Sequence, residues 1–297
     1  MSTVVPEVDS LAPATGLSQG GRREFVRTAL GSALAAAVLP ASAQTIKTDF
    51  TSLIAGEQTV PAGDIQMPVY VARPEKAVGK LPVVLVISEI FGVHEHIADV
   101  ARRFAKQGYL AIAPELFIRQ GDPSAYGTIA ELLEKVVNKV PDPQVLKDLD
   151  ATVAWAVANG GDTSRLGITG FCWGGRQTWL YTAQNKAVKA GVAWYGRLVG
   201  KNDALTSVNP IDVAGKLNAP VLGLYGGQDT GIPLDTVEKM KAALAAAGNP
   251  ASKASQFVVY PNAQHAFNAD YRPSYDEASA KDGWTKCLAW FKDHGVK

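Results

Sequence analysis

The chain has 297 residues, of which 47% are hydrophobic and 19% are charged, a composition ordinary for a globular protein with a sizeable core. The formal net charge is +1 and no long basic run occurs, so neither nucleic acid nor an acidic membrane surface is favoured as a partner. We expect a monomer.

The first 43 residues have the features of a targeting segment. The arginine pair Arg22-Arg23 precedes an apolar run over 29–39, and small residues follow at 41–43. This pattern resembles a bacterial twin-arginine export signal and predicts a periplasmic or otherwise exported mature chain over 44–297. An N-terminal membrane anchor or a disordered tail is the alternative, although the apolar run is about half the ~20 residues that a spanning helix needs.

Apolar stretches alternate with amphipathic ones along the rest of the chain. In chain order we predict a β-hairpin over 57–72, a strand over 81–87, a helix over 94–107, a strand over 109–113, helices over 124–139 and 143–158, a strand over 166–171, a helix over 174–184, strands over 190–194 and 220–225, a helix over 234–247, a strand over 257–260 and a helix over 275–291. This alternation predicts a single α/β domain with a mostly parallel sheet and helices on both faces. Functional loops are then expected at the carboxyl ends of the strands.

A cysteine between two glycines marks the junction of a predicted strand and a predicted helix. The stretch Gly170-Phe171-Cys172-Trp173-Gly174 matches the nucleophile-elbow pattern, with cysteine in the position of serine. The turn is sharp enough to require glycine on both sides, and it places the thiol at a helix N-terminus, where the helix dipole favours the thiolate. We interpret Cys172 as a nucleophile, whereas an inert buried cysteine in a tight packing corner is the alternative.

A nucleophile of this kind needs a base, and the chain has only four histidines. His294 lies at the C-terminus, while the spacing of His94 and His96 does not place them on one helical face and argues against a metal pair. His265 directly follows the last predicted strand, where the fold would bring it over the elbow. We therefore predict His265 as the base and expect no metal.

The base in turn needs an orienting carboxylate. Asp229 directly follows the predicted strand over 220–225, and it lies between nucleophile and histidine in the chain order typical of such elbows. Asp212 and Asp270 are the rival candidates, but neither directly follows a buried strand. We predict Asp229 as the acid, with a helix-capping role as the alternative.

The tetrahedral intermediate of acyl transfer needs two hydrogen-bond donors, which form an oxyanion hole. We expect the backbone N–H groups of Trp173, directly after the nucleophile, and of Ile90, in the loop after the strand over 81–87. The neighbouring Glu89 would point its carboxylate into the site. A solvated loop carboxylate is the alternative interpretation of Glu89.

These residues together resemble the dienelactone hydrolase family (carboxymethylenebutenolidases) within the α/β-hydrolase fold. The likeness covers roughly residues 66–291. It is carried by the stretches 88–92 (Ser-Glu-Ile-Phe-Gly), 170–175 (Gly-Phe-Cys-Trp-Gly-Gly), 226–229 (Gly-Gly-Gln-Asp) and 265–267 (His-Ala-Phe).

The resemblance implies that Cys172, Asp229 and His265 form a triad and that Glu89 helps to activate the thiol. It also implies that Arg119 helps to hold a substrate carboxylate. Four residues after His265, where the family pattern has a second arginine, stands Ala269. Arg272 is the candidate to replace that arginine.

The implied reaction is hydrolysis of an anionic lactone or enol ester through a thioester on cysteine, without metal or cofactor. Three alternatives stay open: a broader carboxylesterase or thioesterase with the same triad, a binding module that has lost turnover, and a redox protein. The redox alternative would use Cys172 and Cys287, which are the only cysteines and could form a disulfide in an exported protein.

Overall fold

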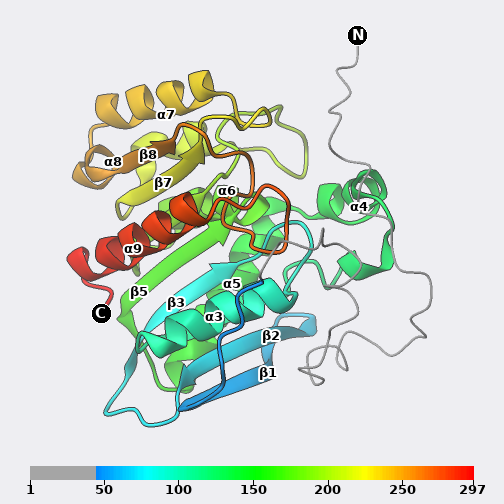
Figure 1. Ribbon diagram of the computed structural model, residues 1–297, viewed down its shortest axis with the longest axis vertical. Coiled ribbons are helices and arrows are strands. Elements are labelled where there is room, and N and C mark those ends of the chain that lie inside the picture. The colour runs from blue at the N-terminus through cyan, green and yellow to red at the C-terminus, as the bar shows by residue number, and fades with distance from the viewer. Residues whose placement is uncertain (1–44) are drawn as a thin grey trace.

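The computed structural model describes residues 45–297, so the predicted export signal over 1–43 lies outside the described residues. Eight strands form one sheet in the order β1-β2-β4-β3-β5-β6-β7-β8 (Figure 1). Their bounds are β1 Leu53–Ala62, β2 Ile65–Pro74, β3 Leu81–Ile87, β4 Leu110–Pro114, β5 Gly161–Phe171, β6 Val188–Trp194, β7 Val221–Gly226 and β8 Gln256–Tyr260. The pairs β1–β2 and β2–β4 are antiparallel, and the other neighbours are parallel. The prediction of a mostly parallel sheet is confirmed, with an antiparallel hairpin at one edge.

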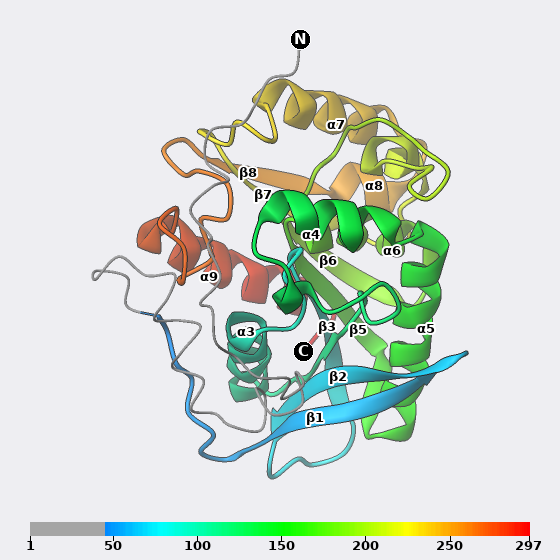
Figure 2. The same cartoon turned by 90° about the vertical axis from the view of Figure 1, so that its right-hand side faces the viewer.

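Helices cover both faces of the sheet, as predicted. The views in Figures 1 and 2 place α3 (Glu95–Lys106) and α9 (Glu277–Asp293) on one face and α5 (Asp142–Ala158) and α6 (Trp173–Gln184) on the other. The helix α7 (Leu234–Ala246) lies beside β7 and β8, followed by the short α8 (Pro250–Ala254). No helix of the described chain is long and apolar enough to cross a membrane.

The sequence explains the burial of the central strands and the start of one helix that packs on them. Every residue of β4 is buried, as are six of the seven residues of β3, because parallel strands between two helical layers have no solvent face. The helix α9 begins at Glu277 because the Asp276 side chain accepts a hydrogen bond from the Ser279 N–H at 2.8 Å.

The prediction of one continuous helix over 124–139 is wrong. The segment contains the 3₁₀ turn Pro123–Ala125, the helix α4 Ile129–Lys135 and the 3₁₀ turn Val137–Lys139. Thr128 has extended backbone and its hydroxyl accepts the Glu131 N–H at 3.2 Å, so it starts a new helix instead of continuing one. The 3₁₀ turn Pro210–Lys216 and helix α8 had no predicted counterpart.

Candidate active site

The turn between β5 and α6 has the geometry predicted for a nucleophile elbow. Cys172 has φ 52° and ψ −111°, in the left-handed half of backbone space that a cysteine rarely adopts. A Cβ on Gly170 would lie 2.2 Å from the carbonyl oxygen of Gly174, and a Cβ on Gly174 would lie 2.4 Å from that of Ile87. Both glycines are therefore needed for the close approach of backbone to backbone at this corner. The Cys172 N–H donates to the Trp194 carbonyl at 3.0 Å, which ties the elbow to the end of β6.

Asp229 and His265 lie within hydrogen-bond distance of each other. The His265 Nδ1 is 2.7 Å from Asp229 Oδ2, and the Asp229 side chain is fully buried. The other carboxylate oxygen accepts the backbone N–H groups of Gly231 and Ile232 at 2.9 and 3.1 Å. The carboxylate is thus fixed by three partners and aims one oxygen at the imidazole.

The two loops that carry this pair are joined backbone to backbone. The Gly227 N–H donates to the Tyr260 carbonyl at 2.7 Å, and the Gln228 N–H donates to the Ala263 carbonyl at 2.9 Å. A Cβ on Gly226 would lie 2.5 Å from the Ala263 oxygen, so the glycine permits this approach. The loop after β7 is therefore held against the loop after β8, and Asp229 faces His265.

The imidazole also interacts with the sulfur of the elbow. Burial works to lower the pKa of His265, but the Coulomb interaction with Cys172 and hydrogen bonds with Asp229 and Cys172 outweigh it and raise the pKa to about 10. The ring is therefore protonated at neutral pH. Cys172, Asp229 and His265 come together at the carboxyl ends of β5, β7 and β8.

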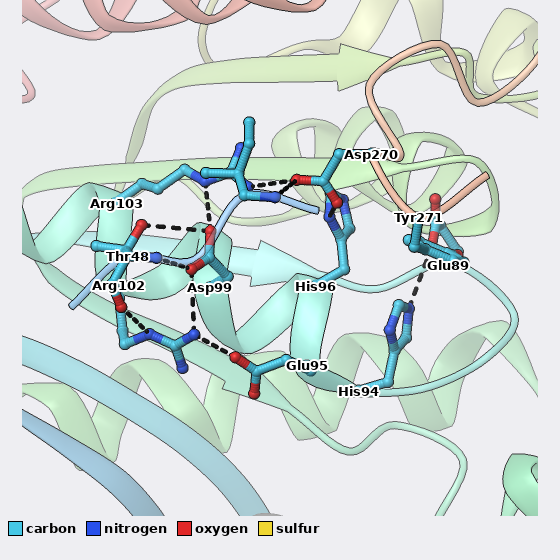
Figure 3. A network of polar contacts seen from close by, with 11 residues as sticks. Thr48, Glu89, His94, Glu95, His96, Asp99, Arg102, Arg103, Asp270 and Tyr271 are labelled. Carbon is cyan, nitrogen blue, oxygen red and sulfur yellow. Dashed lines mark hydrogen bonds and ion pairs between the residues drawn. The ribbon is translucent and has the colours of Figure 1, made fainter. Parts of the chain in front are cut away.

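A buried carboxylate lies at the end of β3, beside the elbow. Glu89 is only 2% exposed, so it is not a solvated loop residue. Its Oε2 accepts the Tyr271 hydroxyl at 2.7 Å and lies 3.4 Å from His94 Nε2 (Figure 3). Burial works to raise the pKa of Glu89, but the hydrogen bond with His94 and the charges of His96 and His94 lower it to about 2. This carboxylate is ionised at neutral pH.

The elbow, the Asp229–His265 pair and the buried Glu89 agree with what a comparison of the sequence with known families shows. The model of the dienelactone hydrolase family matches residues 67–295. The chain is a member of the dienelactone hydrolase family. It is therefore a carboxylic ester hydrolase with an α/β-hydrolase fold.

Relatives in this family are similar to the chain over nearly their full lengths. A protein of Methylorubrum extorquens, named "Putative carboxymethylenebutenolidase", is 56% identical over 298 residues and covers 100% of both chains. A protein of Escherichia coli K12 with the same name is 54% identical over 266 residues, which are 90% of this chain and 97% of the relative. A crystal structure described as a "Putative Dienelactone Hydrolase" from Klebsiella pneumoniae has 59% identity and a TM-score of 0.79, covering 81% of this chain and 98% of that one.

The N–H groups predicted to form an oxyanion hole lie on the two segments that meet at the elbow. Trp173 is the first residue of α6, and Ile90 follows Glu89 in the loop after β3. Neither N–H makes a hydrogen bond within residues 45–297. Their role in the hydrolase stays a prediction.

The two predicted substrate-binding arginines differ in their surroundings. The Arg119 guanidinium donates to Asp64 at 2.9 Å, to Asp148 at 2.7 Å and to the Ala62 carbonyl at 2.7 Å. A substrate carboxylate would have to compete with both of these acids. Arg272 lies over the Phe91 ring, 5.9 Å from its centroid, and makes no ion pair within the part of the chain that the structure describes. Of the two, Arg272 has the guanidinium that is free of acidic partners there.

The structure adds a residue that the sequence analysis missed. Tyr195 follows β6 with φ 38°, and its ring meets the His265 ring edge to face, with centroids 5.2 Å apart. Its buried hydroxyl has no hydrogen-bond partner within residues 45–297. Trp194-Tyr195-Gly196 at a strand end could have signalled it, because Gly196 lets β6 approach α6: a Cβ there would lie 2.4 Å from the Gly175 carbonyl carbon.

Both cysteines of the hydrolase are free in this structure. Cys172 is half-buried, whereas Cys287 lies on α9 and is fully buried. The disulfide that the sequence analysis left open between them is not formed.

Proposed function

We propose that this enzyme hydrolyses a lactone or enol ester of the dienelactone type, with Cys172 as the nucleophile and a thioester as the intermediate. The observation that supports this most directly is the Cys172–His265–Asp229 arrangement at a strained elbow. The thiolate attacks the lactone carbonyl while the N–H groups of Trp173 and Ile90 stabilise the oxyanion. The carbon–oxygen bond then breaks, and the leaving enolate takes the proton from protonated His265.

The second half of the reaction follows from the charges around the imidazole. The raised pKa of His265 depends partly on the negative charge of the Cys172 thiolate. Acylation of the sulfur removes that charge, so the pKa of His265 falls and the neutral ring becomes a competent base. It takes a proton from water, the hydroxide attacks the thioester, and the departing thiolate restores the ion pair. All of these steps use side chains and backbone groups of the chain itself.

The proposal is tested by comparing substrates on the purified wild-type protein. Turnover of a dienelactone, followed by its ultraviolet absorbance, is expected to exceed that of simple aryl esters and of thioesters by at least about tenfold in kcat/KM. An equal or higher kcat/KM for the neutral esters or thioesters would instead identify a broader carboxylesterase or thioesterase. That alternative has support in Ala269, which stands where the family pattern has its second arginine.

We expect Arg272→Ala to raise the KM for an anionic lactone by roughly tenfold, because a guanidinium without an acidic partner is available to a substrate carboxylate. The KM for a neutral aryl ester should stay within about twofold. The measurement is steady-state kinetics on both substrates. An equal change for both would show that Arg272 does not recognise the charge.

Arg119→Ala belongs in the same experiment as a comparison. Its guanidinium pairs with Asp148, whose side chain is only 3% exposed, so its loss leaves a buried carboxylate unpaired. A lower Tm with unchanged KM would assign Arg119 to that pairing, and a raised KM for the anionic substrate would assign it to substrate binding.

A further inference from the structure

The carboxylate of Glu89 has one oxygen bound and one oxygen without a partner. Its Oε2 accepts the Tyr271 hydroxyl at 2.7 Å and approaches His94 Nε2 at 3.4 Å. Its Oε1 is buried and has no hydrogen-bond partner within residues 45–297. A buried charge with an unsatisfied oxygen is costly and calls for an explanation.

The segment that carries this carboxylate packs against the elbow. A Cβ on Gly174, two residues after the nucleophile, would lie 2.6 Å from the Ser88 carbonyl oxygen, and Glu89 is the next residue. Tyr195 lies close enough to interact with both Glu89 and Cys172. Burial raises the pKa of its hydroxyl, and the charges of Glu89 and Cys172 raise this pKa further. Glu89 therefore belongs to the surroundings of the thiol rather than to a remote core network.

Both groups that contact the Glu89 carboxylate are anchored to helix α3, as Figure 3 shows. His94 is the N-cap residue of this helix. Tyr271 follows Asp270, whose carboxylate lies 3.0 Å from His96 Nδ1 and accepts the Arg103 guanidinium at 2.9 Å. His96 and Arg103 both project from α3, so the backbone next to Tyr271 is fixed to this helix.

The contacts that join Asp270 to α3 have further hydrogen bonds around them and are closed to solvent. Asp99, one turn before Arg103 on α3, accepts its Nε at 2.6 Å, and the backbone N–H of Ile46 donates to Asp270 at 3.1 Å. The side chains of His96 and Asp270 are 1% and 0% exposed. Both carboxylate oxygens of Asp270 are paired, so this buried carboxylate has little freedom to rearrange.

We infer that Tyr271 and His94 are positioning residues that hold the Glu89 carboxylate in one orientation, with Oε1 directed to the reacting groups. The inference rests on the proposed function, since it assigns Glu89 a part in the ester hydrolysis that Cys172 carries out. The contacts of His94 and Asp270 with helix α3 keep these two positioning residues in place.

The test is Tyr271→Phe, which removes the hydroxyl and keeps the ring. We expect kcat to fall roughly tenfold, because a hydrogen bond to a charged group is lost, while KM stays within about twofold. Tyr275→Phe is the matched control, since Tyr275 lies on the same loop and donates no hydrogen bond from its hydroxyl within the described chain. A Tyr271→Phe enzyme that is as active as the Tyr275→Phe enzyme would overturn the inference.

A double-mutant cycle separates positioning from simple structural support. In a Glu89→Gln background, Tyr271→Phe should cost less than about twofold further in kcat, because the carboxylate that it positions is gone. If the fold losses in kcat of Glu89→Gln and Tyr271→Phe multiplied in the double variant, Tyr271 would act on a group other than Glu89. The cycle is measured with whichever ester or thioester the wild-type protein hydrolyses best. If the protein does not hydrolyse dienelactone, the proposed substrate is refuted, and the cycle still tests the role of Tyr271.

A crystal structure of the Tyr271→Phe protein gives a readout that needs no substrate. The Glu89 carboxylate should be rotated or present in two orientations, whereas in the Tyr275→Phe protein it should be unchanged. A Glu89 side chain in the same position in both variants would refute the positioning role even if no ester were turned over.

Discussion

Cys172→Ala is expected to lower kcat for ester hydrolysis by at least about ten-thousandfold, because it removes the group that forms the covalent intermediate. Residual catalysis would come from binding and from the backbone donors alone. The measurement is the rate of loss of lactone absorbance at saturating substrate. An enzyme that hydrolyses the ester as fast without the thiol would refute the nucleophile assignment.

The second cysteine provides the matched control for this substitution. Cys287 is fully buried on α9, so Cys287→Ala should lower the Tm through the cavity that it leaves. Its kcat should stay within a few-fold of wild type. Comparable losses of activity in both variants, tracking the loss of folded protein, would point to stability and not to chemistry.

Asp229→Asn is expected to lower kcat about a thousandfold. The asparagine amide can present an N–H to His265 where the carboxylate presents an acceptor at 2.7 Å, which disfavours the tautomer and the charge that the reaction uses. Since the carboxylate helps to raise the pKa of His265, its loss lowers that pKa. The basic limb of the pH profile of kcat/KM should therefore move to lower pH.

Asp235→Asn is the control for this change. Asp235 is exposed at the start of α7 and pairs with Lys239 at 2.8 Å, so its loss should leave kcat within about twofold. If Asp229→Asn kept more than about a tenth of the wild-type kcat, Asp212 or Asp270 would have to be reconsidered as the orienting acid. Asp270 already has partners of its own, His96 and Arg103.

The parts of this enzyme that sequence could predict are those with a local cause. Gly170 and Gly174 around Cys172 are visible in the sequence because each relieves a specific close contact at the elbow. Asp229 follows the buried strand β7 and His265 follows its parallel neighbour β8, so the topology of a parallel sheet brings them to one edge. The central strands and most helices follow from hydrophobic period, and the hairpin follows from its turn residues at 61–64.

The parts that could not be predicted depend on contacts between distant segments. The partners of Arg119, Asp64 and Asp148, come from the β1–β2 turn and from α5, and nothing near Arg119 in the sequence announces them. Tyr271 lies 182 residues from Glu89 in the chain, so their hydrogen bond has no local signature. The break at Thr128 within the predicted helix over 124–139 was missed because a threonine cap has little effect on the hydrophobic period.

The different surroundings of the two sulfur atoms make the protein suited to selective chemical labelling. Burial raises the pKa of Cys287 well above the ordinary range for a thiol, so this group stays protonated and unreactive towards electrophiles at neutral pH. Cys172 is partly accessible to solvent. An alkylating or fluorogenic reagent would thus modify one position per folded chain, and the amount incorporated would count functional sites directly.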